Sequence, residues 1–388
     1  MLTRSGWGAI ALAATSFVIG RVFGIIELFV LGVGIVSALV VAVATVQRRP
    51  PRLAVRRLVQ PSTVQAGEAA RVDLQVANAG GRRTPVLQLW EPVGSTGGAT
   101  MNLAPLRPGE RTTAAYRLPT TDRGVVRVGP MRARRRDVLG LTSRTFLLPG
   151  STELLVMPRH TPIRFAVGGS SGRLGDHLRL RSQGQSGSEF HSLRHYVEGD
   201  DLRRINWKAS ARSNDLVVKE TALEGLRRCT VVVDTADPDV DHDAFERGVS
   251  AAASLVVGAV GAGLSTRLVA PDTDLRGLEV APLALRWLAT VQAGGGDSGW
   301  MPSLKAGEGM GIVLVVTASP DSTCASAVRS SLGPEDTVVV VATQVSSSRG
   351  SRFTVDATSE DSFVSSWAAL TGTLGNGPRL PAAYEATV

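Results

Sequence analysis

Cysteine, aromatic residues and lysine are all scarce in this chain of 388 residues. Its two cysteines, Cys229 and Cys324, each lie in or beside an apolar stretch, where a small buried side chain is the ordinary role of the residue. A framework of several disulfides is therefore excluded, and the low count agrees with a reducing compartment. Arginine outnumbers lysine 39 to 3, which says nothing about function.

Several signatures of nucleotide and hydrolytic chemistry are missing as well. No phosphate-cradling P-loop, nucleophile elbow or G-x-G-x-x-G pattern follows any strand that the sequence predicts. An NTPase, a serine hydrolase or a dehydrogenase therefore has no support. The sequence predicts a protein that is not an enzyme and needs no cofactor.

The length and composition are those of a folded protein with two or three domains, because 43% of residues are apolar and 20% are charged. The charge is unevenly divided. Residues 1–228 have a net charge of +17, whereas residues 229–388 have a net charge of −9. A basic half of this kind is typical of proteins that bind nucleic acid, lie near anionic lipid or carry positive flanks beside membrane spans. We expect anionic lipid and membrane topology, rather than nucleic acid, to explain it here.

A long apolar stretch opens the chain. Residues 7–46 are interrupted mainly by Arg21 and Glu27, so that two spans are predicted, at residues 6–22 and 25–46. A secretory signal peptide with Arg4 in its basic region is the alternative for the first segment. Since a positive flank favours the cytoplasmic side, the soluble body is expected there, on a multi-pass protein of the cell membrane. The arginines of that flank are Arg48, Arg49, Arg52, Arg56 and Arg57.

Residues 47–158 predict a β-rich, sandwich-like module. Residues 70–77 alternate apolar and polar side chains, which places Val72, Leu74 and Val76 on one buried face. Turn sequences rich in Gly, Asn and Pro separate such runs. A dense basic cluster within the module is expected at a solvated strand edge, where charge discourages aggregation; it comprises Arg132, Arg134, Arg135 and Arg136.

Residues 187–220 read GSEFHSLRHYVEGDDLRRINWKASARSNDLVVKE, with charged and large aromatic residues unusually dense. This string resembles the hallmark of the bacterial family called domain of unknown function 58, E-F-x-x-L-R-x-Y-x-x-G-D-x-x-R-x-I-x-W-x-x-x-A-R. An earlier R-G-x-x-x-x-G-P stretch is matched at residues 123–130, whereas Val138 stands where the family usually has proline. The matching hallmark positions are Glu189, Phe190, Leu193, Arg194, Tyr196, Gly199, Asp200, Arg203, Ile205, Trp207, Ala211 and Arg212.

The hallmark segment, residues 159–228, has two interpretations. Its carboxylates and arginines are able to form a charge-assisted network, shielded by Phe190, Tyr196 and Trp207, that clasps an extended segment onto the next domain. Alternatively, the same residues bind a ligand or partner. His191 and His195 beside Glu198 are weak evidence for zinc, because they lack a fixed third ligand.

Residues 229–388 alternate strand and helix patterns, which favours a mostly parallel, helix-covered sheet. Strands are predicted at residues 230–233, 266–270, 312–316 and 338–342, and helices at 244–261, 281–292, 322–330 and 360–370. The resemblance implies that this is a von Willebrand factor type A-like, Rossmann-like α/β domain. The whole chain is thus expected to comprise a transmembrane hairpin (1–46), the β-rich module (47–158), the hallmark segment (159–228) and this domain.

Type A domains hold a metal with D-x-S-x-S at the end of the first strand, since carboxylate and hydroxyl oxygens suit Mg²⁺. Here the string is Asp234-Thr235-Ala236-Asp237-Pro238, which has lost both serine hydroxyls. Asp234 is therefore the one candidate metal ligand, for Mg²⁺ at a degenerate site. The acidic run that follows departs from an EF-hand at its sixth and twelfth positions, His242 and Gly248.

The resemblance also implies a partner. Members of the family are commonly encoded beside MoxR-type AAA+ ATPases and are thought to assemble or remodel proteins with them, so a membrane-tethered adaptor is expected. A basic lipid- or nucleic-acid-binding module with no ATPase partner is the alternative, although the basic cluster has no aromatic residues beside it for stacking on bases. A thiol hydrolase is a third hypothesis and would need an activated Cys229 or Cys324.

Overall fold

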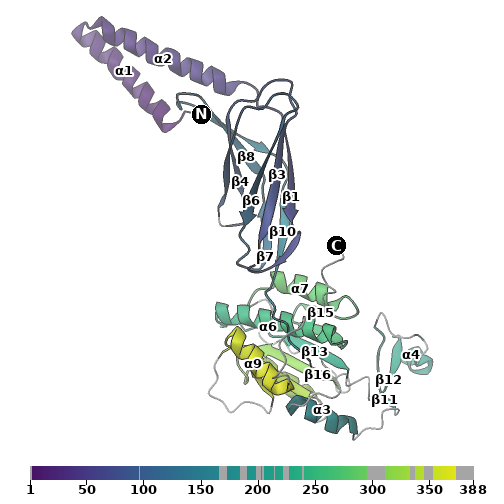
Figure 1. The fold of residues 1–388 in the computed structure, drawn as a ribbon. Helices are drawn as coiled ribbons and strands as arrows, with labels where there is room; N and C mark the ends of the chain where they lie inside the picture. The colour runs from purple at the N-terminus through teal and green to yellow at the C-terminus, as the bar shows by residue number, and fades with distance from the viewer. Residues whose placement is uncertain are drawn as a thin grey trace. The chain divides into compact units, whose positions relative to one another are not determined.

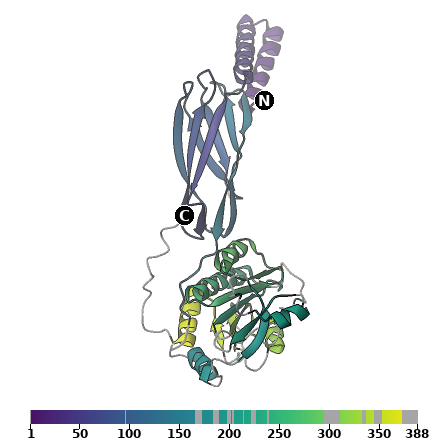
Figure 2. The same cartoon turned by 90° about the vertical axis from the view of Figure 1, so that its right-hand side faces the viewer.

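The computed structural model describes residues 2–95, 97–165, 173–183, 190–197, 202, 205–213, 215–221, 227–237, 240–294, 300, 304, 311–332, 337–344 and 353–372. The chain divides into two compact units, Met1–Val156 and Met157–Val388. Each unit is treated below by itself. Figures 1 and 2 trace the ribbon of both. The four-part division predicted from the sequence is finer than this one and stays a prediction.

The first unit begins with two apolar helices, α1 (Arg4–Phe23) and α2 (Ile26–Gln47), which lie side by side as a hairpin (Figure 1). Thr3 caps α1 by accepting a hydrogen bond from Gly6 N, and Gly24 ends it in the left-handed region at φ 68°. Both helices are long and apolar enough to cross a membrane, as the sequence predicted, and they suggest membrane anchoring.

Close packing within the hairpin depends on two glycines. A Cβ atom on Gly20 would lie 3.0 Å from the ring of Phe29, and one on Gly32 would lie 2.9 Å from the ring of Phe17. Phe17 and Phe29 contact each other in turn, with ring centroids 5.9 Å apart. Small residues at a helix interface let the backbones approach, which is how apolar helices associate in lipid.

The rest of the first unit is antiparallel β structure. Its strands are short, and a single short strand buries little apolar surface without its neighbours. One sheet has the order β1-β3-β6, formed by β1 (Leu53–Gln60), β3 (Ala70–Asn78) and β6 (Arg111–Leu118). A second has the order β2-β10-β7, formed by β2 (Thr63–Gln65), β10 (Thr152–Met157) and β7 (Gly124–Val128). The third has the order β5-β4-β8-β9, formed by β5 (Gly98–Leu103), β4 (Leu87–Pro92), β8 (Met131–Arg136) and β9 (Ser143–Leu148).

The predicted alternation in β3 is confirmed, since Val72, Leu74 and Val76 are all buried, in two apolar clusters of this unit. The prediction for the basic cluster was wrong in one respect. Its arginines lie on β8, which pairs with β4 on one side and β9 on the other, so β8 is an inner strand. Arginine tolerates this position because alternate residues of β8 face outward, and Arg132 lies over the ring of Trp90 at 5.1 Å from its centroid.

A charged group lies inside the same unit. Glu91 of β4 has a side chain that is 0% exposed and forms an ion pair with Arg57 of β1, which is 4% exposed. Tyr116 of β6 donates a hydrogen bond of 2.6 Å to the other carboxylate oxygen of Glu91. At Gly150, a Cβ atom would lie 3.2 Å from Arg57 Nη1, so the glycine leaves room for the guanidinium. Gly129 of the G-P pair noted in the sequence has φ 90°, and a Cβ atom there would lie 2.9 Å from the Gly150 carbonyl oxygen, which accounts for that glycine.

The second unit contains a six-stranded sheet in the order β15-β14-β13-β16-β17-β18. Four pairings are parallel and β14 with β15 is antiparallel, so the mostly parallel sheet predicted for this region is confirmed. The strands are β13 (Arg228–Val233), β14 (Ser265–Ala270), β15 (Thr273–Leu275), β16 (Ile312–Thr317), β17 (Thr337–Ala342) and β18 (Thr354–Asp356).

Helices cover both faces of this sheet (Figure 2). Alternate residues of each strand face an apolar cluster with α6 (His242–Gly261), α7 (Val280–Thr290) and α9 (Glu360–Thr371), while the others face α8 (Thr323–Ser331). Of the described helices, α6 is the third that is apolar and long enough to span a membrane. It is instead a core helix, because 11 of its residues are buried and eight of these belong to the larger cluster.

The hallmark segment lies in the second unit as α3 (Arg173–Gln183), a two-stranded antiparallel sheet and α4 (Trp207–Ser213). The two strands are β11 (Phe190–His195) and β12 (Val217–Thr221). Leu174 of α3 joins the larger apolar cluster beside α9. The extended strand predicted to follow the hallmark is therefore present as β12.

Candidate functional site

The sheet of the second unit has a switch point between β13 and β16. The chain goes from β13 outward to β14 on one side and returns to place β16 on the other side. Loops leave the carboxyl ends of these two strands in opposite directions, which opens the crevice where open α/β sheets bind their ligands. We therefore take this edge as the candidate functional site.

A carboxylate and a hydroxyl meet at that edge. Asp234 follows β13 directly, Thr317 ends β16, and Thr317 Oγ1 donates a hydrogen bond of 2.9 Å to Asp234 Oδ2. The other oxygen, Oδ1, accepts a bond of 3.4 Å from Ala236 N. Neither oxygen has an ion pair to a cation among the described residues. Asp234 is thus held by neutral donors only.

The electrostatics of the edge disfavour the ionised acid. Burial raises the pKa of Asp234, the hydrogen bonds from Thr317 and Ala236 lower it, and the charge of Asp237 raises it, so that the net shift is upward. The adjacent Thr235 is 1% exposed, and its Oγ1 has no hydrogen-bond partner within the described part of the chain. An unsatisfied buried hydroxyl costs free energy and commonly marks a functional position.

Mg²⁺ is the one metal that the sequence suggested here. It prefers six oxygen ligands in an octahedron, usually including more than one carboxylate or phosphate. Apart from Asp237, whose charge acts on Asp234, the described residues at this edge offer the Asp234 carboxylate, both of whose oxygens accept protein hydrogen bonds, together with the hydroxyls of Thr235 and Thr317. No group of three or more His, Cys, Asp or Glu side chains in the described residues is arranged to hold a metal. This donor set does not fit Mg²⁺.

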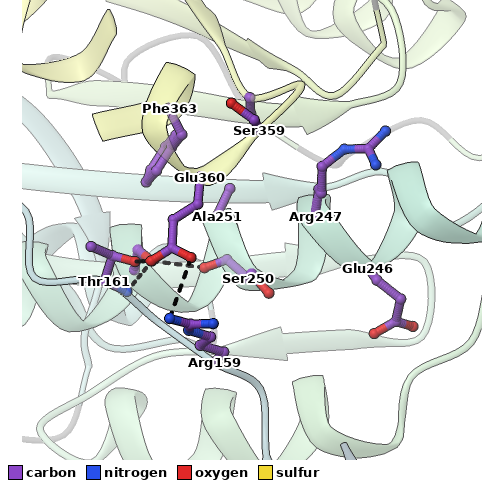
Figure 3. A pocket seen from close by; sticks show the side chains of 11 residues that line it. Arg159, Thr161, Glu246, Arg247, Ser250, Ala251, Ser359, Glu360 and Phe363 are labelled. Atoms are coloured by element: carbon purple, nitrogen blue, oxygen red, sulfur yellow. Dashed lines mark hydrogen bonds and ion pairs between the residues drawn. The ribbon is translucent and has the colours of Figure 1, made fainter. Parts of the chain in front are cut away.

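A pocket of about 200 Å³ lies between α6 and α9, near the carboxyl ends of β17 and β18, and neither Asp234 nor Thr317 lines it (Figure 3). Its wall is formed by one face of α6 and the start of α9, with a segment that precedes α3. Glu360 at the first turn of α9 accepts a bond of 2.7 Å from Thr161 Oγ1 and lies 3.7 Å from Arg159. The lining residues are Arg159, Thr161, Glu246, Arg247, Ser250, Ala251, Ser254, Ala357, Ser359, Glu360 and Phe363.

Arg247 links the pocket to the sheet. Its Nη2 donates a bond of 3.2 Å to the backbone oxygen of Thr343, just after β17, and its buried Nε has no acceptor among the described residues. Figure 3 shows the side chain beside Ser359, across the pocket from Arg159. A guanidinium with an unused donor is suited to a carboxylate or carbonyl oxygen from an incoming group.

The hallmark residues form a small structure of their own. Ile205 is buried and bridges to Val218, and Tyr196 N donates a bond of 2.7 Å to Leu216 O. Ser210 of α4 accepts a bond of 2.8 Å from Val217 N, which ties the helix to β12. These bonds explain why the segment needs its isoleucine and small α4 residues, but they involve none of the predicted charged pairs.

The predicted charge network falls largely outside the described residues. Glu189, Gly199, Asp200 and Arg203 lie there, as do the side chains of Phe190 and Arg194. Trp207 is 65% exposed and Arg212 is exposed on α4. His195 lies 3.7 Å from Asp215, whereas Glu198 is not described. The choice between a clasp and a binding site therefore stays open.

Sequence reasoning missed several residues of the edge. It identified Asp234 but not Thr317 as its partner, and it missed Arg247, Thr161 and Glu360 altogether. Thr317 could have been found as the polar residue that ends a buried parallel strand, since such ends share an edge. Thr161 and Glu360 are 199 positions apart, and nothing in the sequence pairs them.

Neither cysteine is suited to nucleophilic chemistry. Burial raises the pKa of Cys229, and burial followed by the charge of Asp234 raises the pKa of Cys324 to about 12. The thiolate is the reactive form, and these surroundings suppress it. The thiol hydrolase hypothesis therefore loses its nucleophile.

Residues 192–268, which run from the hallmark segment into β14, match the family model described as protein of unknown function DUF58. The chain carries a DUF58 domain. It is also similar to the uncharacterized protein YeaD of Bacillus subtilis strain 168, with 29% identity over 167 residues. That alignment covers 40% of this chain and 39% of YeaD, so the chain matches about two fifths of its relative. The resemblance of the hallmark to DUF58 is confirmed.

Two solved structures each match a part of this chain. The CARDB domain of PF1109 from Pyrococcus furiosus covers 27% of this chain and 93% of its own, with 19% identity and a TM-score of 0.21. The alkylpurine DNA glycosylase AlkC of Pseudomonas fluorescens, bound to DNA containing an abasic site analog, covers 28% and 33%, with 16% identity and a TM-score of 0.18. Likenesses at this level carry no argument about function.

Proposed function

We propose that this DUF58 protein is a membrane-tethered adaptor whose α/β domain, of von Willebrand factor type A-like design, binds a partner protein at the carboxyl edge of its sheet. The observation that carries the proposal is the switch point, where Asp234 and Thr317 meet, together with a separate pocket near the ends of β17 and β18 that is lined by charged and hydroxyl side chains. Strand ends of this kind position residues for binding on a rigid frame.

The size of the pocket favours a protein partner over a small ligand. Pockets that enclose drug-sized ligands usually hold about 300–1,000 Å³, and this one holds about 200 Å³. A single side chain of a partner fits such a space. The unused Nε of Arg247 and the hydroxyls of Ser250 and Ser359 suit an acidic or amide side chain.

The proposal places the body in the cytoplasm, on a multi-pass anchor. Arg48, Arg49 and Arg52 directly follow α2, and such a flank favours the cytoplasmic side. We further propose, on the resemblance stated above, that the partner is a MoxR-type AAA+ ATPase, which would supply the energy for protein assembly or remodelling. The client protein is then brought to the membrane by the adaptor.

The test is a pull-down of the tagged full-length protein from its own membranes, with mass spectrometry of cross-linked partners. Two edge variants, Asp234→Asn and Arg247→Gln, are compared with wild type. Arg227→Gln is the matched control, because Arg227 is exposed at the opposite end of β13. A fourth variant, Asp200→Ala, tests whether the hallmark segment takes part in binding the partner.

An AAA+ ATPase that is cross-linked to wild type and Arg227→Gln but lost from both edge variants would support the adaptor. Loss from Asp200→Ala as well would add the hallmark to the binding surface. Absence of any AAA+ ATPase from every sample would overturn the partner assignment. Equal capture of the ATPase by wild type and all four variants would mean that the partner binds away from the edge.

A further inference from the structure

The turn between β8 and β9 lies against the ends of the two apolar helices within the first unit. Thr3 N donates a bond of 2.9 Å to Leu141 O, and Thr142 Oγ1 donates one of 3.1 Å to Ala42 O. A Cβ atom on Gly6 would lie 2.2 Å from Leu141 O, so the turn and the first turn of α1 are in close contact. Since Ala42 is five residues before the end of α2, this contact is about 7 Å along the helix from its end.

Two apolar side chains are exposed on that turn. Val138 is fully exposed and Leu139 is 64% exposed, and both lie on the tip that precedes Gly140, whose φ is 69°. The turn is well built rather than loose: Asp137 accepts bonds from Leu139 N and from the backbone and hydroxyl of Thr142. Trp7, on the first turn of α1, is likewise 64% exposed. Aromatic and aliphatic residues at this level are typical of a membrane interface.

Arginines surround the same turn. Arg144 Nη1 donates a bond of 3.2 Å to Gln47 O at the end of α2, and Arg135 is its cross-strand partner. Arg136 lies along Gly140. We call these three residues and Arg48 the juxtamembrane arginine cluster. None of the four forms an ion pair within the described residues.

Like charges held this close repel one another unless an anion lies between them. Burial and then the nearby charge of Arg48 lower the pKa of Arg135. Cross-strand pairs of like charge are also unfavourable in a sheet, as Arg135 and Arg144 are. Asp137 carries one negative charge beside the four arginines, and its oxygens accept hydrogen bonds within the turn. Within the described residues the cluster therefore keeps an excess of positive charge, which an external anion would balance.

We propose that the β8–β9 turn and the juxtamembrane arginine cluster form a contact site for the bilayer that the hairpin enters, with Val138 and Leu139 in the interface and the arginines on anionic headgroups. The occupant follows from position, since the cluster adjoins the end of an apolar helix, and from charge. Residues 48–52 are a short connection with two prolines, Pro50 and Pro51, which keeps β1 close to α2. The site is independent of any ATPase partner.

Binding of anionic lipid by the full-length protein tests the arginines. The protein is purified in detergent with phosphatidylglycerol, and retained lipid is measured by native mass spectrometry. In the triple variant Arg135→Gln, Arg136→Gln, Arg144→Gln, affinity should fall about fivefold for each arginine, or on the order of a hundredfold together. The control triple is Arg71→Gln, Arg117→Gln, Arg127→Gln.

The control is matched in charge and lies elsewhere on the β structure. Arg71 pairs with Gln60, at the opposite end of β1 from the hairpin, roughly 20 Å along the strand. Arg117 is the cross-strand partner of Arg71, and Arg127 is exposed on β7. Equal retention by the two triple variants would overturn the arginine site. Loss in the cluster variant alone would support it.

The turn is tested in reconstituted vesicles. Leu139→Cys carries an environment-sensitive fluorophore, while Cys229 and Cys324 are buried and do not compete for the label. Nitroxide lipids should quench the label in vesicles of phosphatidylcholine with phosphatidylglycerol. The label should be quenched less when the protein also carries the triple substitution in the arginine cluster. A label that nitroxide lipids do not quench in the wild-type background would overturn the placement of the turn, even if an ATPase partner had been found.

Discussion

A buried carboxylate in the first unit and a partly buried one in the second show how differently this protein treats a charge taken out of water. Glu91 is enclosed with a guanidinium and a phenol, so its charge is balanced. Among the described residues, Asp234 has only a hydroxyl and a backbone amide, beside the Thr235 hydroxyl, for which they supply no hydrogen-bond partner. The first arrangement completes a fold, whereas the second leaves an acid that gains from a further contact. This contrast is why the functional site is placed at the second.

The largest expected effect is at Glu91. Glu91→Gln leaves Arg57 buried without its counter-charge, and breaking a buried pair costs about 3–5 kcal/mol of unfolding free energy. Pulse proteolysis of the full-length protein in detergent across a urea series measures the loss. Replacing both partners with apolar residues, Arg57→Met with Glu91→Leu, should recover much of it. A loss below about 1 kcal/mol in the single variant would mean that the pair is solvated.

A change in unfolding free energy of the opposite sign is expected at Asp234. Asp234→Asn removes a carboxylate that burial disfavours, so we expect a gain of about 0.5–2 kcal/mol at neutral pH, the usual range for relieving a functional site. Because the folded pKa is raised, the folded state binds more protons than the unfolded state. Wild-type stability should therefore rise as the pH falls from neutral through the folded pKa, and the variant should lack this rise. Urea midpoints at several pH values measure both effects.

A loss of stability of comparable size is expected when the hydroxyl that bonds Asp234 is removed. Thr317→Val keeps the shape of the side chain but removes the donor to Asp234, and the loss of one hydrogen bond to a buried group should cost about 1–3 kcal/mol. The pKa of Asp234 should rise further, so the pH-dependent part of stability should shift to higher pH. A Thr317→Ser variant, which keeps the donor, should not shift it. The same urea series serves for all three proteins.

An exposed ion pair gives the lower limit for the loss of stability when a charge is removed. Arg127 and Glu153 are 2.8 Å apart with side chains that are 68% and 52% exposed, and Glu153→Gln should change stability by about 0–1 kcal/mol. The change should shrink further in high salt, since screening acts on exposed charges. A loss comparable with that of Glu91→Gln would show that exposure does not govern the cost of a missing charge here.

The smallest effect is expected from Mg²⁺. If the donor set at Asp234 does not fit the ion, millimolar Mg²⁺ should change the stability of wild type and Asp234→Asn equally. A ligand that binds only the folded state stabilises it by mass action, so a selective gain in wild type would reveal a metal site. Ca²⁺ in the same titration separates a specific site from a general response to divalent cations.

Much of the fold was accessible from the sequence, for physical reasons that differ by region. The hairpin was predicted because residues 7–46 have few polar interruptions, and the ends of its helices differ from the predicted spans by one or two residues. The four strands and four helices predicted after residue 229 are all present, with ends that differ by two residues at most, because buried parallel strands and amphipathic helices have distinct periods.

The site was less accessible. Asp234 was found because it holds the first position of the D-x-S-x-S pattern after a predicted strand, but the pairing with Thr317 depends on strand order, which no local pattern gives. The basic cluster was misplaced for the same reason: β8 reads as an edge in isolation and becomes an inner strand only when β4 and β9 join it. Contacts between distant positions, such as Thr161 with Glu360, arise from the tertiary fold alone.

The apolar character of α6 has a consequence for biosynthesis. If α1 and α2 anchor the chain in a membrane as proposed, the insertion machinery that engages them also meets a third segment of 20 residues that satisfies the same length and composition criteria. Two features distinguish α6 from a membrane span. It packs against β13 and β14, and charged residues lie at its start, namely Asp241, Asp243, Glu246 and Arg247. Folding of this helix onto its sheet thus competes with insertion, and substitutions that slow it would produce a chain with the wrong number of spans.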